Sequence, residues 1–371
     1  MINTSAAIRV IRPLLQDRPR LKAALKRVDH GLGVLRHSLA PAVPGLIRPQ
    51  PRQITIAITA KCNLQCEGCK YGSREFMTGA QLPLDVVRHV LDDAHTAGVN
   101  TARFYGGEPL LHPDLPAMIA HARGLGLDAY VTTNGTLLER RVEELFAAGL
   151  RWMTIGFYGV GEAYDGYTHR PGHFARLRAG LERARRDYGA ALAIQLNFVL
   201  SRRSASLAAL GEAWALAREF DLHFSVDPIS ETIPFFQNPN GDLHFETEHA
   251  AELQAVVDEL LRLRNAHPER MPQSRTLLRA LPDLLLRGDS MRVPCDAYEL
   301  LWVGADGTVQ LCDVAFPLGN VRRQRLGDLL FTRDHRRACQ RGFRLQCPNC
   351  ACKIDSRIRK HAASLRRYGS C

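Results

Sequence analysis

Short apolar runs alternate with longer amphipathic stretches from residue 53 to residue 228. The runs are rich in β-branched residues, which is typical of buried strands, and the stretches repeat apolar residues at helical spacing. The predicted strands are 53–59, 101–105, 127–132, 151–157, 192–199 and 222–228. The predicted helices are 83–97, 113–124, 136–148, 173–187 and 205–219. This alternation predicts parallel βαβ units, which fit both a doubly wound sheet and an incomplete (β/α) barrel.

The alternation stops after residue 228. Residues 230–245 are rich in Pro, Asn and aromatic residues, so we expect a long loop there. One amphipathic helix is predicted at 247–265, and a stretch punctuated by prolines follows as far as Pro294. The pattern therefore indicates a connecting segment and then a separate C-terminal region.

The first 50 residues are also distinct from the repeating part. Pro19 is suited to the first turn of a helix, in which Leu21, Ala24, Leu25 and Val28 share one face. The prolines between residues 41 and 51 then predict an extended linker. Such a basic amphipathic helix either packs on the following domain or lies on a membrane surface, and we favour packing.

Composition places the chain among folded proteins. Its 371 residues are 46% hydrophobic and 23% charged, which excludes wholesale disorder. It has no apolar run long enough to span a bilayer, and residues 1–16 lack the apolar core of a signal peptide. A cytoplasmic protein is therefore expected. The ten cysteines then favour metal or redox chemistry over a disulfide framework.

Charge is distributed unevenly along the chain. Residues 1–52 contain ten Lys and Arg against two acids, and residues 320–371 contain fourteen against three. The basic ends favour an anionic partner, such as a membrane surface, a phosphorylated substrate or nucleic acid. A solvated basic surface without a partner is the alternative.

Three cysteines follow the first predicted strand, at Cys62, Cys66 and Cys69. On a loop at a strand end, thiolates with this spacing can face one small cluster. Structural zinc usually takes four protein ligands, whereas an iron–sulfur cluster held by three cysteines leaves one iron open. A zinc loop completed by a distant ligand is the alternative interpretation.

Two further motifs follow the second and third predicted strands. The second strand runs into Gly106-Gly107-Glu108-Pro109, and the third ends at Asn134-Gly135. Both motifs belong at the C-terminal edge of a parallel sheet, where ligands bind in such folds. This placement predicts that they share one site with the cysteines.

Together these motifs resemble those of the radical S-adenosylmethionine (SAM) enzymes. The resemblance implies an incomplete (β/α)6 barrel and a 4Fe–4S cluster on Cys62, Cys66 and Cys69. It also implies that SAM chelates the fourth iron, with Gly106, Gly107 and Glu108 positioning its amino group. Reductive cleavage of SAM then yields a 5′-deoxyadenosyl radical, which abstracts a substrate hydrogen.

One position departs from the family pattern. Family members often have an aromatic residue before the third cysteine, where this chain has Gly68. The adenine of SAM then needs another contact, for which Tyr71 is a candidate. Asn134 is a further candidate for cofactor binding.

A second cysteine region begins at Cys295. The Asp306-Gly307 pair is a hairpin signal between the predicted strands 300–303 and 308–311, and the hairpin brings Cys295 and Cys312 to one side. The pair Cys347 and Cys350 adds a two-thiolate clamp, so four ligands can close around zinc or an iron–sulfur cluster.

The same region resembles the SPASM/twitch extensions that follow many radical SAM barrels. The shorter twitch pattern fits best and implies one auxiliary 4Fe–4S cluster on Cys295, Cys312, Cys347 and Cys350. A second auxiliary cluster lacks convincing ligands, and three cysteines stay unassigned: Cys339, Cys352 and Cys371. The expected division of the chain is 1–50, 51–229, 230–290 and 291–371.

The leading function hypothesis is an oxidoreductase or epimerase acting on a small, polar, non-peptide molecule, such as a sugar, aminoglycoside-type or lipid-linked intermediate. Flavodoxin or ferredoxin would supply the electron. In an epimerase, Cys352 or Cys339 would return a hydrogen. His169 and Arg170 either bind a polar or anionic substrate or act in proton transfer; the alternative is that they cap the next helix or pair on the surface.

Two other classes of function account for part of the sequence. A peptide maturase is the main alternative, although residues 1–50 look too short for a leader-recognition domain. A nucleic-acid-binding scaffold would suit the basic ends, but the complete set of cluster and Gly-Gly-Glu motifs argues against it.

Overall fold

A computed structural model describes residues 19–230, 232–237, 241–288 and 291–369. Six parallel strands form a curved sheet in the order β6-β5-β4-β3-β2-β1. Every predicted strand is present, with its ends shifted by at most one residue. The strands are β1 Gln53–Thr59, β2 Thr101–Gly106, β3 Asp128–Thr133, β4 Trp152–Phe157, β5 Ala193–Leu200 and β6 His223–Pro228.

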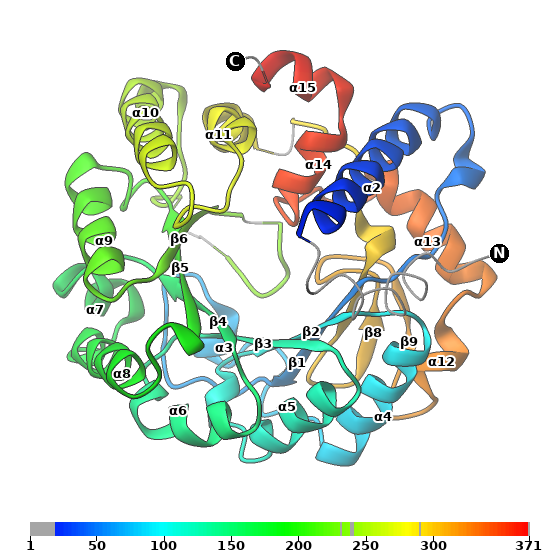
Figure 1. Cartoon of the computed structure of the whole chain (residues 1–371), viewed down its shortest axis with the longest axis horizontal. Helices are drawn as coiled ribbons and strands as arrows, with labels where there is room; N and C mark the ends of the chain where they lie inside the picture. The colour runs from blue at the N-terminus through cyan, green and yellow to red at the C-terminus, as the bar shows by residue number, and fades with distance from the viewer. Residues whose placement is uncertain (1–18, 231, 238–240, 289–290, 370–371) are drawn as a thin grey trace.

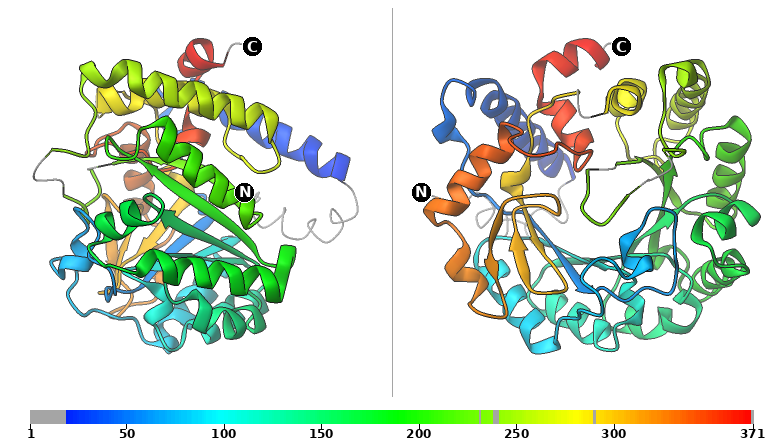
Figure 2. Two further views of the ribbon diagram at one scale, coloured as in Figure 1. Left: turned by 90° about the vertical axis from the view of Figure 1, so that its left-hand side faces the viewer. Right: turned by 180° about the vertical axis from the view of Figure 1, so that it is seen from behind.

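The predicted helices cover the convex side of this sheet (Figure 2). Their apolar faces are buried against it; in α4, for example, Val87, Val90 and Leu91 are enclosed. These helices are α4 Leu84–Thr96, α5 Leu115–Gly124, α6 Leu138–Ala147, α8 His173–Tyr188 and α9 Leu207–Glu219. Two short helices, α3 Lys70–Ser73 and α7 Glu162–Thr168, lie in the loops after β1 and β4. The incomplete (β/α)6 barrel is confirmed.

The two faces of the barrel strands differ in polarity. Along β2, Ala102 and Phe104 are buried towards the helices, whereas Arg103 and Tyr105 alternate with them on the inner face. In β5 and β6 the inner face carries Gln195, Asn197, Ser225 and Asp227, which share a hydrogen-bond network or line a cavity. The inside of this barrel is therefore polar, unlike the apolar interior of a closed (β/α)8 barrel.

The C-terminal region continues the same sheet. Strand β7 (Leu300–Val303) pairs in parallel with β1, and it forms the predicted hairpin with β8 (Thr308–Gln310). Strand β9 (Pro317–Asn320) completes a nine-stranded sheet. Four helices follow: α12 Leu326–Leu329, α13 Arg333–Phe343, α14 Ile354–Lys360 and α15 Ala362–Tyr368.

Helices α10 (Ala250–Ala266) and α11 (Arg275–Arg287) stand on the open side of the barrel, with α14 near them (Figure 1). The sequence pattern did not predict α11, because Pro282 lies inside it. Its apolar face, which includes Leu277, Leu278 and Leu281, is buried, and this burial outweighs the local cost of the proline.

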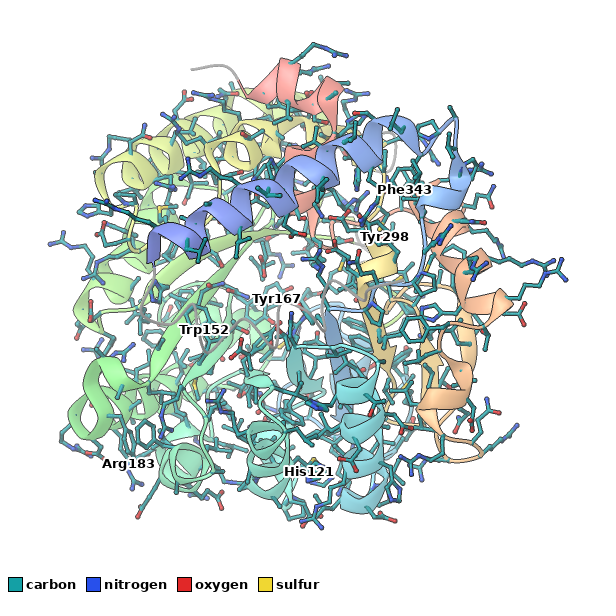
Figure 3. The ribbon with its side chains drawn as sticks, turned by 45° about the vertical axis from the view of Figure 1, so that its right-hand side comes forward. His121, Trp152, Tyr167, Arg183, Tyr298 and Phe343 are labelled. Carbon is teal, nitrogen blue, oxygen red and sulfur yellow. The ribbon has the colours of Figure 1, made fainter. Side chains whose placement is uncertain are left out.

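The N-terminal helix α2 (Pro19–Leu39) is longer than the predicted first turns and crosses the outside of the molecule beside α14 (Figures 1 and 3). Helix α2 packs on the rest of the protein, as the sequence pattern favoured. It does so through its polar side and not through its leucines. Beneath it, the rings of Tyr298 and Phe343 contact the buried ring of His37. Within the described part of the chain, no helix has the length and apolar character to cross a membrane.

Candidate SAM and iron–sulfur site

The three cysteines of the first motif lie on the loop between β1 and α3. Burial raises the pKa of the Cys62 thiol to about 12 and also raises the pKa of the Cys66 thiol, and the charge of Cys69 adds to the rise in both. The three thiols are thus close enough to influence one another's ionisation. This loop, residues 60–69, is called the cluster loop below.

The paired glycines after β2 hold the start of the cluster loop. The backbone NH of Gly107 donates to the carbonyl of Thr59, and that of Glu108 donates to the carbonyl of Lys61, each over 2.8 Å. A Cβ atom at Gly106 would lie 2.1 Å from the Thr59 oxygen, and one at Gly107 would lie 2.4 Å from the Lys61 oxygen. Only glycine permits this close approach of two backbones.

Glu108 connects the Gly-Gly-Glu-Pro motif after β2 to the Asn-Gly motif after β3 by hydrogen bonds. Its buried carboxylate accepts hydrogen bonds from the Leu110 NH (2.9 Å), the Thr133 hydroxyl (2.7 Å) and the Asn134 NH (2.8 Å). Burial raises the pKa of this carboxyl, and the three hydrogen bonds oppose the rise. Because both oxygens already have protein partners, a predicted contact with the amino group of SAM would have to share them.

Asn134 completes the connection. Its side-chain amide donates to Asn63 Oδ1 over 2.9 Å, and the Asn63 amide donates to the Thr136 hydroxyl over 2.8 Å. The Tyr164 hydroxyl, from α7, donates to the Asn134 carbonyl over 3.1 Å. Asn63 was not predicted from the sequence, although its position directly after Cys62 was a signal. The ends of β1, β2 and β3 therefore form one hydrogen-bonded unit.

The loop after β6 covers the cluster loop. Gly68 has a φ of +71°, and a Cβ atom there would lie 2.8 Å from the Phe236 ring. The backbone NH of Gln237 donates to the Gly68 carbonyl over 2.8 Å. The ring of Phe236 therefore lies against Gly68, the position at which many family members have an aromatic side chain.

Tyr71 lies in an aromatic cluster beside the cluster loop, with its ring 5.1 Å from that of Phe76 and 5.3 Å from that of Phe235. Its hydroxyl is buried and has no hydrogen-bond partner among the described residues. A buried unpaired hydroxyl beside the cluster loop fits a site that receives a polar ligand.

The donor set also fits a cluster. Within the described residues, no three His, Cys, Asp or Glu side chains are arranged to hold a single metal ion. A 4Fe–4S cluster binds its cysteines through separate irons, so the three thiols of the cluster loop need not converge on one point.

The second cysteine region faces the inside of the barrel. Burial raises the pKa of the Cys352 thiol well above its usual value, and the nearby Asp313, Cys350, Cys295 and Cys312 add to the rise. The charge of Cys347 likewise raises the pKa of the Cys295 thiol. All four predicted ligands of the auxiliary cluster therefore lie in one neighbourhood, together with Cys352.

Arg357 holds this neighbourhood together. Its guanidinium is buried and donates to the carbonyl of Val293 over 2.6 Å, to that of Cys350 over 2.5 Å, and to Asn349 Oδ1 over 3.2 Å. It thereby joins the segment before Cys295 to the loop that carries Cys350. The sequence offered no signal for this role, because nothing in the local pattern distinguishes Arg357 from its basic neighbours.

Cys339 does not belong to this group. It is fully buried in an apolar cluster with Ala40, Leu311 and Phe343, and burial alone raises the pKa of its thiol. It does not line the cavity described below, and its role in returning a hydrogen to the substrate stays a prediction. Cys371 lies outside the described residues.

A cavity of about 390 Å³ lies inside the barrel. Three cysteines, Cys312, Cys350 and Cys352, line one side of it. Tyr105, Phe235 and Trp302 form an aromatic wall that also packs against Cys62, Cys69 and Tyr71. The polar lining includes Gln53, Thr55, Arg103, Tyr130, Asp227, Asp313 and Lys353. The cavity thus lies between the two cysteine groups.

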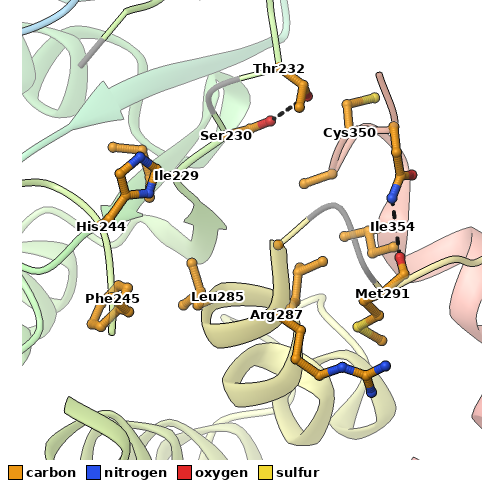
Figure 4. Close-up of a pocket in the computed structure, with 14 residues that line it drawn as sticks. Ile229, Ser230, Thr232, His244, Phe245, Leu285, Arg287, Met291, Cys350 and Ile354 are labelled. Atoms are coloured by element: carbon orange, nitrogen blue, oxygen red, sulfur yellow. Dashed lines mark hydrogen bonds between the residues drawn. The ribbon is translucent and has the colours of Figure 1, made fainter. Parts of the chain in front are cut away.

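A larger pocket of about 510 Å³ adjoins this cavity and shares Ser230, Cys350 and Ala351 with it. Figure 4 shows Cys350 on one side, and Ile229, His244 and Phe245 on the other. Much of its lining is apolar, from α11 and the loop after β6.

His169 and Arg170 line neither space. His169, at the end of α7, lies 3.0 Å from the Glu67 carboxylate, and both His169 and Arg170 are exposed. Their role towards a substrate stays a prediction.

The fold and this geometry define a class of protein, an incomplete (β/α)6 barrel with a three-cysteine site at its strand ends. Residues 56–190 match the family model of the radical SAM superfamily. The chain therefore carries a radical SAM domain, whose cofactors are a 4Fe–4S cluster and SAM.

Comparison with known proteins shows partial similarity. The chain is 33% identical over 171 residues to AdoMet-dependent heme synthase of Methanosarcina barkeri, covering 46% of this chain and 48% of that protein. It is 31% identical over 175 residues to PqqA peptide cyclase of Xanthomonas campestris, covering 46% of each. The chain thus spans about half the length of these curated relatives.

A solved structure extends the likeness of fold. Streptococcus suis SuiB bound to its precursor peptide SuiA superposes with a TM-score of 0.60 at 17% identity, over 86% of this chain and 72% of that one. At this identity the likeness concerns the fold alone.

Proposed function

We propose that this protein is a radical SAM enzyme that removes hydrogen from a small, polar, non-peptide substrate. The observation that carries the proposal is the 390 Å³ polar cavity between the cluster loop and the second cysteine region. Its volume is near the lower end of the range of about 300–1,000 Å³ for small-molecule sites. When bound, the 4Fe–4S cluster and SAM supply a 5′-deoxyadenosyl radical.

The charges in the cavity indicate the kind of substrate. Arg103 is held by a 2.8 Å hydrogen bond to the Thr132 hydroxyl and lies over the Tyr105 ring, 4.5 Å from its centroid. Burial raises the pKa values of Asp227 and Asp313, and Arg103 opposes the rise in both. Two carboxyls around one guanidinium suit hydroxyl and amino groups better than several phosphates. A sugar or aminoglycoside-type substrate fits this lining.

Two features bear on the outcome of the reaction. Cys295, Cys312, Cys347 and Cys350 would hold an auxiliary 4Fe–4S cluster, which favours net oxidation of the substrate. The Cys352 thiol lines the cavity and is placed to return a hydrogen, which favours epimerisation. We favour oxidation, because it uses four neighbouring thiols rather than one.

A peptide substrate is the second candidate. The larger pocket beside the cavity would accommodate a longer, partly apolar substrate, and one curated relative is named a peptide cyclase. A lipid-linked intermediate would use the same pocket.

Deuterium transfer tests the proposal. Reconstituted enzyme is incubated with SAM, a reductant and panels of deuterated sugars, amino sugars or peptides, and deuterium is measured in 5′-deoxyadenosine. We expect transfer from a small polar compound, about 100-fold weaker transfer in Asp227→Asn, and unchanged transfer in the control Asp258→Asn, an exposed carboxylate on α10. Transfer from peptides alone would overturn the proposal in favour of the second candidate.

A further inference from the structure

Helix α2 presents its apolar side to solvent. Its large apolar residues recur at alternating steps of four and three, so they form one line along the helix. These residues are 42% to 59% exposed and are called the α2 stripe: Leu21, Leu25, Val28, Leu32, Leu35 and Leu39. The stripe is about 27 Å long at a rise of 1.5 Å per residue.

The opposite side of α2 is buried through polar and small residues. Asp29 accepts two hydrogen bonds of 2.8 Å from Arg52, the residue before β1, and His37 bonds to the fully buried Asp296 over 2.8 Å. At Gly33 a Cβ atom would lie 3.2 Å from the Lys360 side chain, so the helix approaches α14 closely. These contacts set the rotation of α2, and they leave the leucines facing outward.

A helix that packs through polar and small residues and exposes a line of leucines, with Arg20 and Arg27 also exposed, is suited to a partner with an apolar layer. The charge of α2 distinguishes between two such partners, a second copy of this chain and a membrane surface. Its 21 residues include five Lys and Arg and one acid, Asp29, which is paired with Arg52. Two copies meeting along the stripe would bring two such cationic helices together, whereas an anionic bilayer would attract them.

A second basic feature adjoins the polar side of α2. A pocket of about 330 Å³ is lined by His30, Arg264, Arg275, Arg279 and Arg359, and no Asp or Glu lines it among the described residues. Asp355 approaches only its edge, where it accepts a hydrogen bond of 2.5 Å from the Ser274 hydroxyl. Arg264 and Arg279 also donate to the carbonyls of Gln273 and Tyr368. The pocket itself is therefore cationic, and the acids around it, such as Asp283 and Asp355, already have protein partners.

We infer that α2 docks this protein on an anionic membrane surface, with the α2 stripe in the bilayer interface and the exposed Arg20 and Arg27 of the same helix against lipid phosphates. This inference does not depend on the proposed substrate. The strand ends that carry the cluster loop lie at the other end of β1 from Arg52, so the SAM site stays away from the docked face.

Vesicle sedimentation of the full chain tests this inference. We expect binding to mixed phosphatidylcholine–phosphatidylserine vesicles, weaker binding to phosphatidylcholine alone, and a loss of the difference at high salt. The variant L25Q/L32Q/L35Q should bind at least about 100-fold more weakly. The matched control is L207Q, which changes a leucine that is 55% exposed on α9 and should bind like the wild type.

The exposed arginines of α2 have their own pair of variants. R20Q/R27Q should weaken binding to the anionic vesicles about tenfold or more, whereas the control R176Q, an exposed arginine on α8, should change it much less. Equal binding to neutral and anionic vesicles would overturn the charge argument.

Two results would assign the stripe to another occupant and overturn the inference. One is a wild-type dimer in light scattering that L25Q/L32Q/L35Q dissociates, with no vesicle binding. The other is vesicle binding that survives in L25Q/L32Q/L35Q but is lost when Ile8, Ile11 and Leu14 are changed to Gln. Unchanged circular dichroism shows that each variant is folded.

Discussion

The two cysteine regions of this protein are built in different ways. In the cluster loop, three cysteines lie within one short segment, and backbone hydrogen bonds from Gly107 and Glu108 hold its start. In the second region, the cysteines are spread from residue 295 to residue 352, and the buried side chain of Arg357 joins their segments. A locally built site therefore depends on backbone geometry, whereas a site assembled from distant segments depends on single side chains.

The largest expected effect comes from removing the first region alone. Replacement of Cys62, Cys66 and Cys69 by Ala should abolish 5′-deoxyadenosine formation and lower the iron content from about eight to about four per chain. Iron analysis and product chromatography after anaerobic reconstitution check this. Stoichiometric zinc without iron–sulfur absorbance in the wild type would contradict the assignment of both regions.

Arg357→Ala should remove the second region alone. Loss of a buried guanidinium leaves several carbonyls unpaired, at a cost of about 3 kcal/mol or more. We expect about four irons per chain, continued SAM cleavage and no product. Arg359→Ala, an exposed residue on the same helix, is the control and should retain both clusters. Simultaneous loss of both clusters would show that the regions are not independent.

Gly107→Ala tests the backbone contacts of the first region. A Cβ atom 2.4 Å from the Lys61 carbonyl must displace the cluster loop, so SAM cleavage should fall about 10- to 100-fold. Gly211→Ala, on α9, adds a methyl group with no atom within 4 Å and should leave the rate unchanged. Similar rates in the two variants would argue against a tight fit of the two backbones.

Low pH should destabilise the protein through His335, which lies within the second cysteine region. Burial lowers the pKa of His335 on α13 to about 4, against an unfolded value near 6.5. The unfolded state then binds more protons between these values, so the free energy of unfolding falls by about 2 kcal/mol as the pH drops from 7 to 4.5. Denaturant titrations of the wild type and His335→Gln check this. An equal slope with pH in both proteins would exclude His335 as the cause.

The pattern of the sequence was sufficient for the barrel and for the first cysteine region. Strands such as 53–59 are recognisable because apolar, β-branched runs are local properties of the chain. Cys62, Cys66 and Cys69 are predictable as a group because a short loop cannot separate them widely. The hairpin of β7 and β8 was likewise predicted from the turn signal Asp306-Gly307.

Only the tertiary structure decided features that depend on residues far apart in the chain. The amphipathic pattern of α2 predicts buried leucines, but Arg52 and Asp296 bury its polar side instead, because ion pairs with distant partners offset the cost of burying charge. The position of Phe236 against Gly68 comes from the loop after β6, 168 residues further on in the chain. Cys339 and Cys352 look equivalent in sequence, yet one lies in an apolar cluster and the other lines the cavity. Sequence patterns show which side of a helix or strand is apolar and where the chain turns. Which other element packs against that side is decided by tertiary packing.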